Sequence, residues 1–189
     1  METRPARPRH PAAAASNGLT RLPTSQGDTL RLLIQGFIRE SGLLSGDQTP
    51  CGKPLPISHA HALMVLLEHR HAGRKPTQQE LGRVLRIDKS NVTRLCQKME
   101  KAGQVIQERG PEDGRMRLLA LTDRGVRLAR SVEQASRQRF QRLIMAVRQD
   151  RRERVLEALA VLNDALAVAA SGAATTGRRG SAANRASAA

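Results

Sequence analysis

The clearest pattern in the chain is a series of apolar stripes with helical spacing between residues 28 and 169. The first stripe predicts an amphipathic helix over about 28–44, because its residues recur at i, i+3, i+4, i+7 and i+8. These residues are Leu30, Leu33, Ile34, Phe37 and Ile38. A loop rich in proline and glycine follows, and Ser58 is expected to cap a second helix that ends near His71.

Two short helices joined by a tight turn are predicted next. Thr77 and Glu80 have the T-x-x-E form of a capping box, which indicates the start of a helix. Arg86 and Ile87 form the turn, and Asp88 caps a helix that runs from Lys89 to Lys101. The apolar stripe of that helix is Val92, Leu95, Cys96 and Met99. Gly103 stands where a left-handed helix cap is expected.

After Gly103 the apolar residues no longer follow the helical period. Short strand-like runs at 105–106 and 118–121 flank the turn-rich segment 110–114, which predicts a β-hairpin. Thr122 caps a long helix, and Asp150 with Glu153 offers a second cap before a last helix. The stripe of the last helix is Val155, Leu159, Leu162 and Leu166. The order of elements predicts a mainly α fold with a small β-hairpin wing, a winged helix-turn-helix carrying N- and C-terminal dimerisation helices.

The domain boundaries follow from composition. Segments 1–27 and 170–189 have no periodic apolar pattern, and we expect a disordered basic N-terminal arm and a disordered tail. The winged helix domain is predicted over 28–169, with its helix-turn-helix and hairpin part at about 58–122. The helices at about 28–44 and 122–169 have three stripes, more than a small winged domain can cover, so we expect a homodimer.

The charge of the chain favours a polyanionic partner. It has 32 Lys and Arg against 17 Asp and Glu, a net charge of +15, so nucleic acid is the first candidate. Aromatic residues amount to 1%, which argues against single-strand binding by base stacking and leaves double-stranded DNA. Two cysteines make no disulfide framework, and no apolar run is long enough for a membrane helix, so we expect a cytoplasmic protein.

The predicted helix after Asp88 has a second face made only of hydrogen-bond donors. It consists of Lys89, Ser90, Asn91, Thr93, Arg94, Gln97 and Lys98, with no acidic residue. We expect Asn91, Thr93 and Arg94 to read bases in the major groove. We expect phosphate contacts from Ser90, Lys98, Lys89 and, on the preceding helix, Gln78.

The hairpin adds arginines. Arg109, Arg115 and Arg117 bracket its tip and are expected near the DNA backbone or minor groove. Asp113 is expected to orient Arg115 through a paired hydrogen bond.

The chain resembles the MarR (multiple antibiotic resistance regulator) family of bacterial transcription factors over about 28–169. The residues that carry the resemblance are Thr77-x-x-Glu80-Leu81, Asp88 to Leu95, Ala102-Gly103, Asp113-Gly-Arg115 and Leu121-Thr122-x-x-Gly125. Two positions depart from the pattern: Gly114 replaces an arginine of the wing, and Gln104 replaces an apolar residue.

The resemblance implies a homodimer with interlocked terminal helices that represses promoters and is released by a small ligand or oxidation. Two reading helices related by twofold symmetry predict a pseudo-palindromic site with half-sites about 10 bp apart. The alternative is an architectural DNA-binding protein without an effector, which would show little sequence preference.

Other chemistry has weaker support. Cys51 lies in a Pro-Cys-Gly loop and is a candidate for redox sensing, whereas Cys96 belongs to a buried stripe. His59, His61, His69 and His71 with Cys51 could suggest a metal sensor, but His59 and His61 project about 200° apart on a helix, and a site would need help from the partner chain or the loop. We therefore expect no metal site, and we expect no cofactor. Neither a nucleophile elbow nor a phosphate loop is present, and we expect no enzyme activity.

Overall fold

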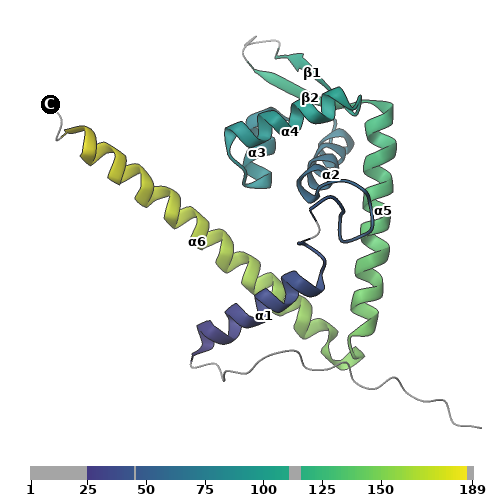
Figure 1. Ribbon diagram of the computed structural model, residues 1–189, viewed down its shortest axis with the longest axis vertical. Coiled ribbons are helices and arrows are strands. Elements are labelled where there is room, and N and C mark those ends of the chain that lie inside the picture. The colour runs from purple at the N-terminus through teal and green to yellow at the C-terminus, as the bar shows by residue number, and fades with distance from the viewer. Residues whose placement is uncertain (1–24, 45, 111–115, 187–189) are drawn as a thin grey trace, which may run out of the picture. The chain divides into compact units, whose positions relative to one another are not determined.

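The computed structural model describes residues 25–44, 46–110 and 116–186, with side chains up to residue 170. It divides into two compact units, Met1–Gly46 and Asp47–Ala189, and each is described by itself. Figure 1 shows the helices and strands of the described residues in their order along the chain.

The first unit contains helix α1 (Gln26–Glu40). Ser25 caps it by accepting a hydrogen bond from the backbone N–H of Asp28 at 3.1 Å. This cap starts the helix at Gln26, inside the segment 1–27 that the composition predicts as an arm. No residue of α1 is buried: Leu33 is 64% exposed and Phe37 is 51% exposed.

The second unit opens with the loop that leads to α2 (Ile57–His71). The predicted cap at Ser58 is wrong. Pro56 occupies the N-cap position with an extended backbone (φ −59°, ψ 148°) and no side-chain cap. Its carbonyl accepts the N–H of Ala60 at 3.1 Å, so the fixed φ of proline sets the start of the helix.

Helices α3 (Gln78–Leu85) and α4 (Lys89–Lys101) form the predicted helix-turn-helix. The capping box is present: Thr77 Oγ1 accepts the Glu80 N–H at 3.1 Å, and Glu80 Oε2 accepts the Thr77 N–H at 2.7 Å. Arg86 ends α3 in the left-handed region with φ 53°. Asp88 caps α4 by accepting the Asn91 N–H at 2.8 Å.

The wing begins directly after α4. Gly103 has φ +65°, and the N–H of Gln104 donates to the Met99 carbonyl at 3.0 Å, which closes the helix end. Strands β1 (Val105–Arg109) and β2 (Arg117–Leu121) then pair antiparallel. The N–H of Leu119 also donates to the Pro76 carbonyl at 2.8 Å, which fastens β2 to the start of α3.

Helix α5 (Asp123–Ala146) is capped by Thr122, as predicted. The predicted cap at Asp150 is wrong, because both carboxylate oxygens of Asp150 accept hydrogen bonds from Arg148, at 3.0 and 2.6 Å. A short 3₁₀ turn η1 (Gln149–Arg151) forms there and leads into α6 (Arg152–Ala186). The backbone of α6 extends beyond residue 169, in a segment rich in alanine, the strongest helix former.

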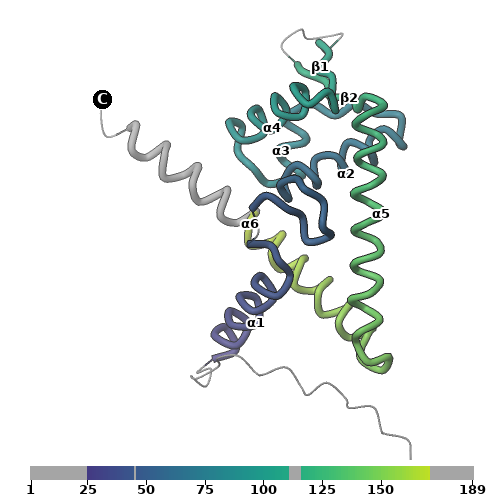
Figure 2. The backbone as a smooth tube through the Cα atoms, turned by 45° about the vertical axis from the view of Figure 1, so that its right-hand side comes forward, coloured from purple at the N-terminus to yellow at the C-terminus, as the bar shows by residue number. Residues whose placement is uncertain are grey.

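Helix α2 lies at the centre of the core of the second unit. Helix α2 contacts α3, α4, α5 and β2, and both views place it between the α3–α4 pair and α5 (Figures 1 and 2). The largest fully buried side chains include Leu63, Leu81, Met99, Leu119 and Val132. The prediction of a mainly helical fold with a small hairpin wing is confirmed.

Candidate nucleic-acid interface

Helix α4 separates its two faces as its sequence predicts. Val92, Leu95, Cys96 and Met99 are all buried. The donor face is open: Thr93 is half-buried, and the remaining members are exposed, namely Lys89, Ser90, Asn91, Arg94, Gln97 and Lys98. An exposed helix face of this kind is what a major groove can receive.

Asp88 organises the first turn of the donor face. Its carboxylate accepts hydrogen bonds from the Ser90 hydroxyl at 2.6 Å, from the Asn91 N–H at 2.8 Å and from the Asn91 side-chain amide. The Ser90 hydroxyl and the Asn91 N–H hold the pKa of Asp88 below its ordinary value. The cap therefore aligns the side chains of Ser90 and Asn91.

The other predicted base readers also have partners within the helix. Thr93 Oγ1 donates to the Lys89 carbonyl at 2.8 Å, and Arg94 Nη2 donates to Ser90 Oγ at 3.3 Å. These contacts are exposed, so exchanging them for contacts to a base leaves no buried polar group unsatisfied. The donors are ordered before any partner arrives.

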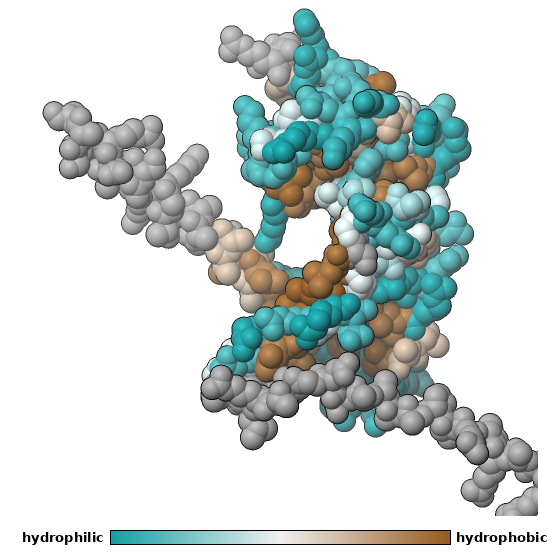
Figure 3. All heavy atoms as spheres, viewed as in Figure 1, coloured by the Kyte–Doolittle hydropathy of each residue, from teal (hydrophilic) through white to brown (hydrophobic). Residues whose placement is uncertain are grey.

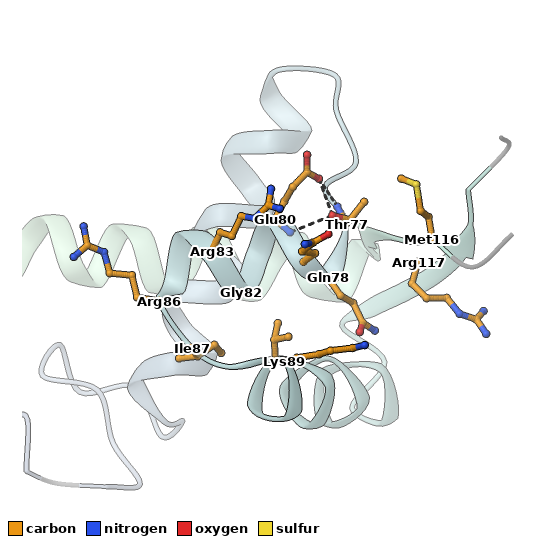
Figure 4. Close-up of a pocket in the computed structure, with 12 residues that line it drawn as sticks. Thr77, Gln78, Glu80, Gly82, Arg83, Arg86, Ile87, Lys89, Met116 and Arg117 are labelled. Carbon is orange, nitrogen blue, oxygen red and sulfur yellow. Dashed lines mark hydrogen bonds between the residues drawn. The ribbon is translucent and has the colours of Figure 1, made fainter. Parts of the chain in front are cut away.

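A groove of about 750 Å³ runs beside α4, between α3 and strand β2. Four cationic residues line it: Arg83, Arg86, Lys89 and Arg117. In Figure 4, Gln78 extends from α3 toward α4, and the side chain of Lys89 lies near it. Its lining also includes the apolar residues Ile87, Val92 and Met116.

Glu80 is the single acidic residue among the described residues that line this groove. Its carboxylate accepts hydrogen bonds from the backbone N–H and the hydroxyl of Thr77, which hold the pKa of Glu80 below its ordinary value. The carboxylate keeps its negative charge at neutral pH, but four cationic residues against one carboxylate leave the groove with a net positive charge.

Gln78 has a second role that its sequence position does not reveal. Its side-chain amide donates to Gln107 Oε1 on β1, and Gln107 Nε2 donates to Glu100 Oε2 on α4 at 2.7 Å. This chain of amides links α3, the wing and α4. Lys75 Nζ adds an ion pair to Glu108 at 2.6 Å, which also ties the wing to the segment before α3.

The wing presents two arginines side by side. Arg109 and Arg117 are cross-strand partners at the outer end of the hairpin, and both are exposed. Asp113 and Arg115, the other residues predicted for the wing, lie outside the described residues.

A polar contact that sequence reasoning missed joins half-buried His59, in α2, to buried Gln104, the residue before β1. Gln104 is 8% exposed, and its Oε1 accepts a hydrogen bond from His59 Nε2 at 2.5 Å. The backbone carbonyl of Gln104 accepts the Thr122 N–H at 3.0 Å. The signal was visible as a polar residue where the family pattern has an apolar one, and its partner lies 45 residues away.

The remaining cysteine and histidine candidates have these positions. Cys51 is half-buried, with its Sγ 3.1 Å from Thr49 Oγ1, whereas burial raises the pKa of the Cys96 thiol to about 11. His69 Nδ1 donates to the Val65 carbonyl at 2.9 Å. Within the described ranges, no three His, Cys, Asp or Glu side chains gather as a metal site would require. The helices described there include none long and apolar enough to span a membrane.

Residues 53–116 match the model of the MarR family. A curated relative, the uncharacterized HTH-type transcriptional regulator YdgJ of Bacillus subtilis strain 168, is 30% identical over 98 residues. The match covers 52% of this chain and 58% of the relative, so the chain spans little more than half the length of this relative.

Solved structures share the fold. A probable transcriptional regulator from Pseudomonas aeruginosa has a TM-score of 0.57 at 24% identity, covering 75% of this chain and 99% of its own. MepR of Staphylococcus aureus in complex with DNA has a TM-score of 0.56 at 17% identity (75% and 98%). PcaV of Streptomyces coelicolor with its natural ligand has a TM-score of 0.54 at 21% identity (79% and 99%). The segment 53–116 is therefore similar to the MarR family of transcriptional regulators, and these solved structures share the fold of the chain.

Proposed function

We propose that the protein is a transcriptional regulator that binds double-stranded DNA in a sequence-specific manner, most simply as a repressor. The observation that carries this proposal is the donor face of α4, which is exposed, free of acidic residues and ordered by Asp88. Asn91, Thr93 and Arg94 would contact base edges, because amide, hydroxyl and guanidinium groups match their donor and acceptor patterns.

The groove beside α4 supports a path for the sugar–phosphate backbone. Lys89 and Arg117 stand on two of its walls, and Gln78 is held between them by its bond to Gln107. Ser90 and Lys98, on the exposed face, would add phosphate contacts. Arg115 with Asp113 remains a prediction for the tip of the wing.

Exposed apolar side chains support a homodimer. On α5 and α6 they include Phe140, Leu143, Met145, Leu156, Leu159, Val161 and Leu166. Figure 3 shows hydrophobic side chains (brown) at the lower end of α5 and along α6. Large apolar patches of this kind mark association surfaces, and we propose 28–44 and 122–169 as the dimerisation segments around a DNA-binding part at about 58–122.

A ligand or oxidant is the proposed release signal. One structural neighbour was solved with DNA and another with its natural ligand, which makes both kinds of partner reasonable for this chain. Cys51 is the candidate thiol for oxidation, because it is half-buried whereas Cys96 is buried.

Selection from a pool of randomised duplexes, at stated salt and with or without reductant, tests the proposal. We expect recovery of a pseudo-palindrome with half-sites about 10 bp apart. Recovery of no preferred sequence would favour the architectural alternative, in which the protein binds any duplex with steep salt dependence.

Two variants then distinguish residues that contact bases from residues that contact phosphates. Arg94→Ala should cost about 1–3 kcal/mol at one base position, if its contact is bidentate. Lys98→Ala should weaken all sequences equally and reduce the salt slope by about one. Equal weakening of every sequence by Arg94→Ala would refute its role as a base reader.

A further inference from the structure

A second cationic surface lies on the outer side of α5. Arg124, Arg127, Arg130, Arg137 and Arg142 are all exposed. At 100° per residue they fall within about 140° of the helix circumference, along a length of about 27 Å. We call them the arginine face of α5.

The opposite side of α5 holds the fold together. Gly125, Val126, Ala129 and Val132 are buried, and α5 contacts α2 on that side. The arginine face therefore points away from α2. In Figure 3 the right-hand edge of the molecule over α5 is largely hydrophilic (teal).

The charge of this face is hardly compensated. Between Arg124 and Arg142 the sequence has one carboxylate, Glu133, and it pairs with Arg137 at 2.7 Å. Asp123 stands at the start of the helix. The described residues give Arg124, Arg127 and Arg130 no acidic partner within ion-pair distance.

A lysine from another element adds to the same charge. Lys53, in the loop before α2, donates from its Nζ to Ser131 Oγ at 2.7 Å. Ser131 is one turn beyond Arg127 on the helix. A cation held here by a neutral hydroxyl increases the positive potential, so a bound polyanion would relieve the repulsion.

We propose that the arginine face of α5 binds the phosphate backbone of a duplex DNA segment other than the one held by α4. Exposed Gln134, Gln138 and Gln141 lie among the arginines and can donate to phosphates. The face has no aromatic side chain on which bases could stack and no apolar side chain to enter a membrane. Helix α2 separates it from α3 and α4 (Figures 1 and 2), so one straight duplex cannot follow both surfaces.

The test uses three full-length proteins and a 60-bp duplex of random sequence. The variant Arg124→Gln, Arg127→Gln, Arg130→Gln removes three charges from the face. The control Arg148→Gln, Arg151→Gln, Arg154→Gln removes the same charge from exposed positions in and beside η1 and the first turn of α6. Circular dichroism establishes that all three are folded.

We expect the slope of log K against log salt to fall by about 2–3 in the α5 variant, because each lost phosphate contact contributes about 0.9. The control should keep the slope of the unmodified protein. Equal slopes in all three proteins, or an equal fall in the control, would overturn the proposal.

A capture assay tests for the second duplex. A duplex fixed to beads and a labelled free duplex are mixed with each protein, and we expect the α5 variant to retain ten times less label. Unchanged capture would overturn the second site while leaving the proposed regulator intact. Failure of the unmodified protein to bind any duplex would instead refute the proposed function. Binding of polyglutamate, but not duplex, through these arginines would overturn the assignment in favour of an acidic protein partner.

Discussion

The winged domain buries its large apolar side chains, whereas α6 leaves them exposed. In the winged domain Leu63, Leu81 and Met99 have no exposed surface. On α6, Leu159 is 48% exposed and Leu156 is 57% exposed. One region completes its core within a single chain, whereas the other has an apolar face that nothing in its own unit covers.

The difference in burial follows from how many elements share a core. Helices α2, α3 and α4 and the wing are short, and each contributes one stripe to a shared centre. Helix α6 has an amphipathic stripe but, within the described part of the chain, no buried residue before position 171. Burial of one leucine side chain is worth about 1.5–3 kcal/mol, so such a stripe favours association with a second surface.

The largest effect is expected at the joint of the wing and α5. A Cβ on Gly125 would lie 1.9 Å from the Gln104 carbonyl oxygen and 2.9 Å from its carbon, both backbone atoms. Gly125→Ala should therefore lower the free energy of unfolding by about 3 kcal/mol or more, measured by urea denaturation.

The matched control is Gly36→Ala in α1, where an added Cβ meets nothing within 4 Å. It should stabilise the helix by up to about 1 kcal/mol, because alanine favours helix more than glycine does. Similar losses at both positions would mean that the joint tolerates a side chain.

Truncation of a core side chain should give the next largest loss of unfolding free energy. Leu63→Ala removes a fully buried side chain and should cost about 2–5 kcal/mol in urea denaturation. The same change at Leu33, which is 64% exposed in its unit, should leave the unfolding of the winged domain unchanged. A larger loss at Leu33 would show that the two regions unfold together.

A charge on the exposed apolar stripe of α6 should weaken dimerisation without unfolding the winged domain. Leu159→Asp should raise the dimer dissociation constant at least about tenfold, since it places a charge in an apolar interface. Ala160→Asp puts the same charge about 100° further round the helix and should have a smaller effect. Sedimentation gives the dissociation constants, and an unmodified protein that is monomeric in dilute buffer would contradict the proposed dimer.

The capping box should give a smaller, pH-dependent effect. The pKa of Glu80 is below its ordinary value of 4.5, so its contribution is present at neutral pH and disappears as the pH falls through the lowered pKa. Unfolding free energies between pH 7 and 3 should decline less in Glu80→Gln than in the unmodified protein. Identical pH profiles would exclude the carboxylate as a source of this dependence. At pH 7, Thr77→Ala should cost about 1 kcal/mol.

The least perturbing test compares the two cysteines. With a pKa of about 11 and a buried side chain, Cys96 should resist iodoacetamide at pH 8 until the domain unfolds. Cys51 should react in the folded protein, so mass spectrometry should find one modified cysteine, and none in Cys51→Ser. Rapid modification of Cys96 in the folded protein would show that the core of the winged domain opens readily.

The helix-turn-helix could be predicted because its signals are local. The capping residues Thr77, Asp88 and Thr122 act within three positions of their partners. The stripe of α4 needs only the period of the helix. The two wrong caps show the limit of such local signals. Pro56, rather than Ser58, occupies the N-cap position of α2, and the carboxylate of Asp150 accepts hydrogen bonds from Arg148 instead of capping α6. Residue type alone does not decide which neighbour takes the cap position or the carboxylate.

The sequence by itself determined the order of the elements, the division of α4 into a buried and a donor face, and the family resemblance, because these depend on residues a few positions apart. Only the tertiary structure decided that Gln104 is bonded to His59, that Gln78 is bonded to Gln107 of the wing, and that Lys53 is bonded to Ser131 of α5. Each of these contacts joins residues 29 to 78 positions apart, and chain separation of that size leaves no periodic signal for a pattern to reveal.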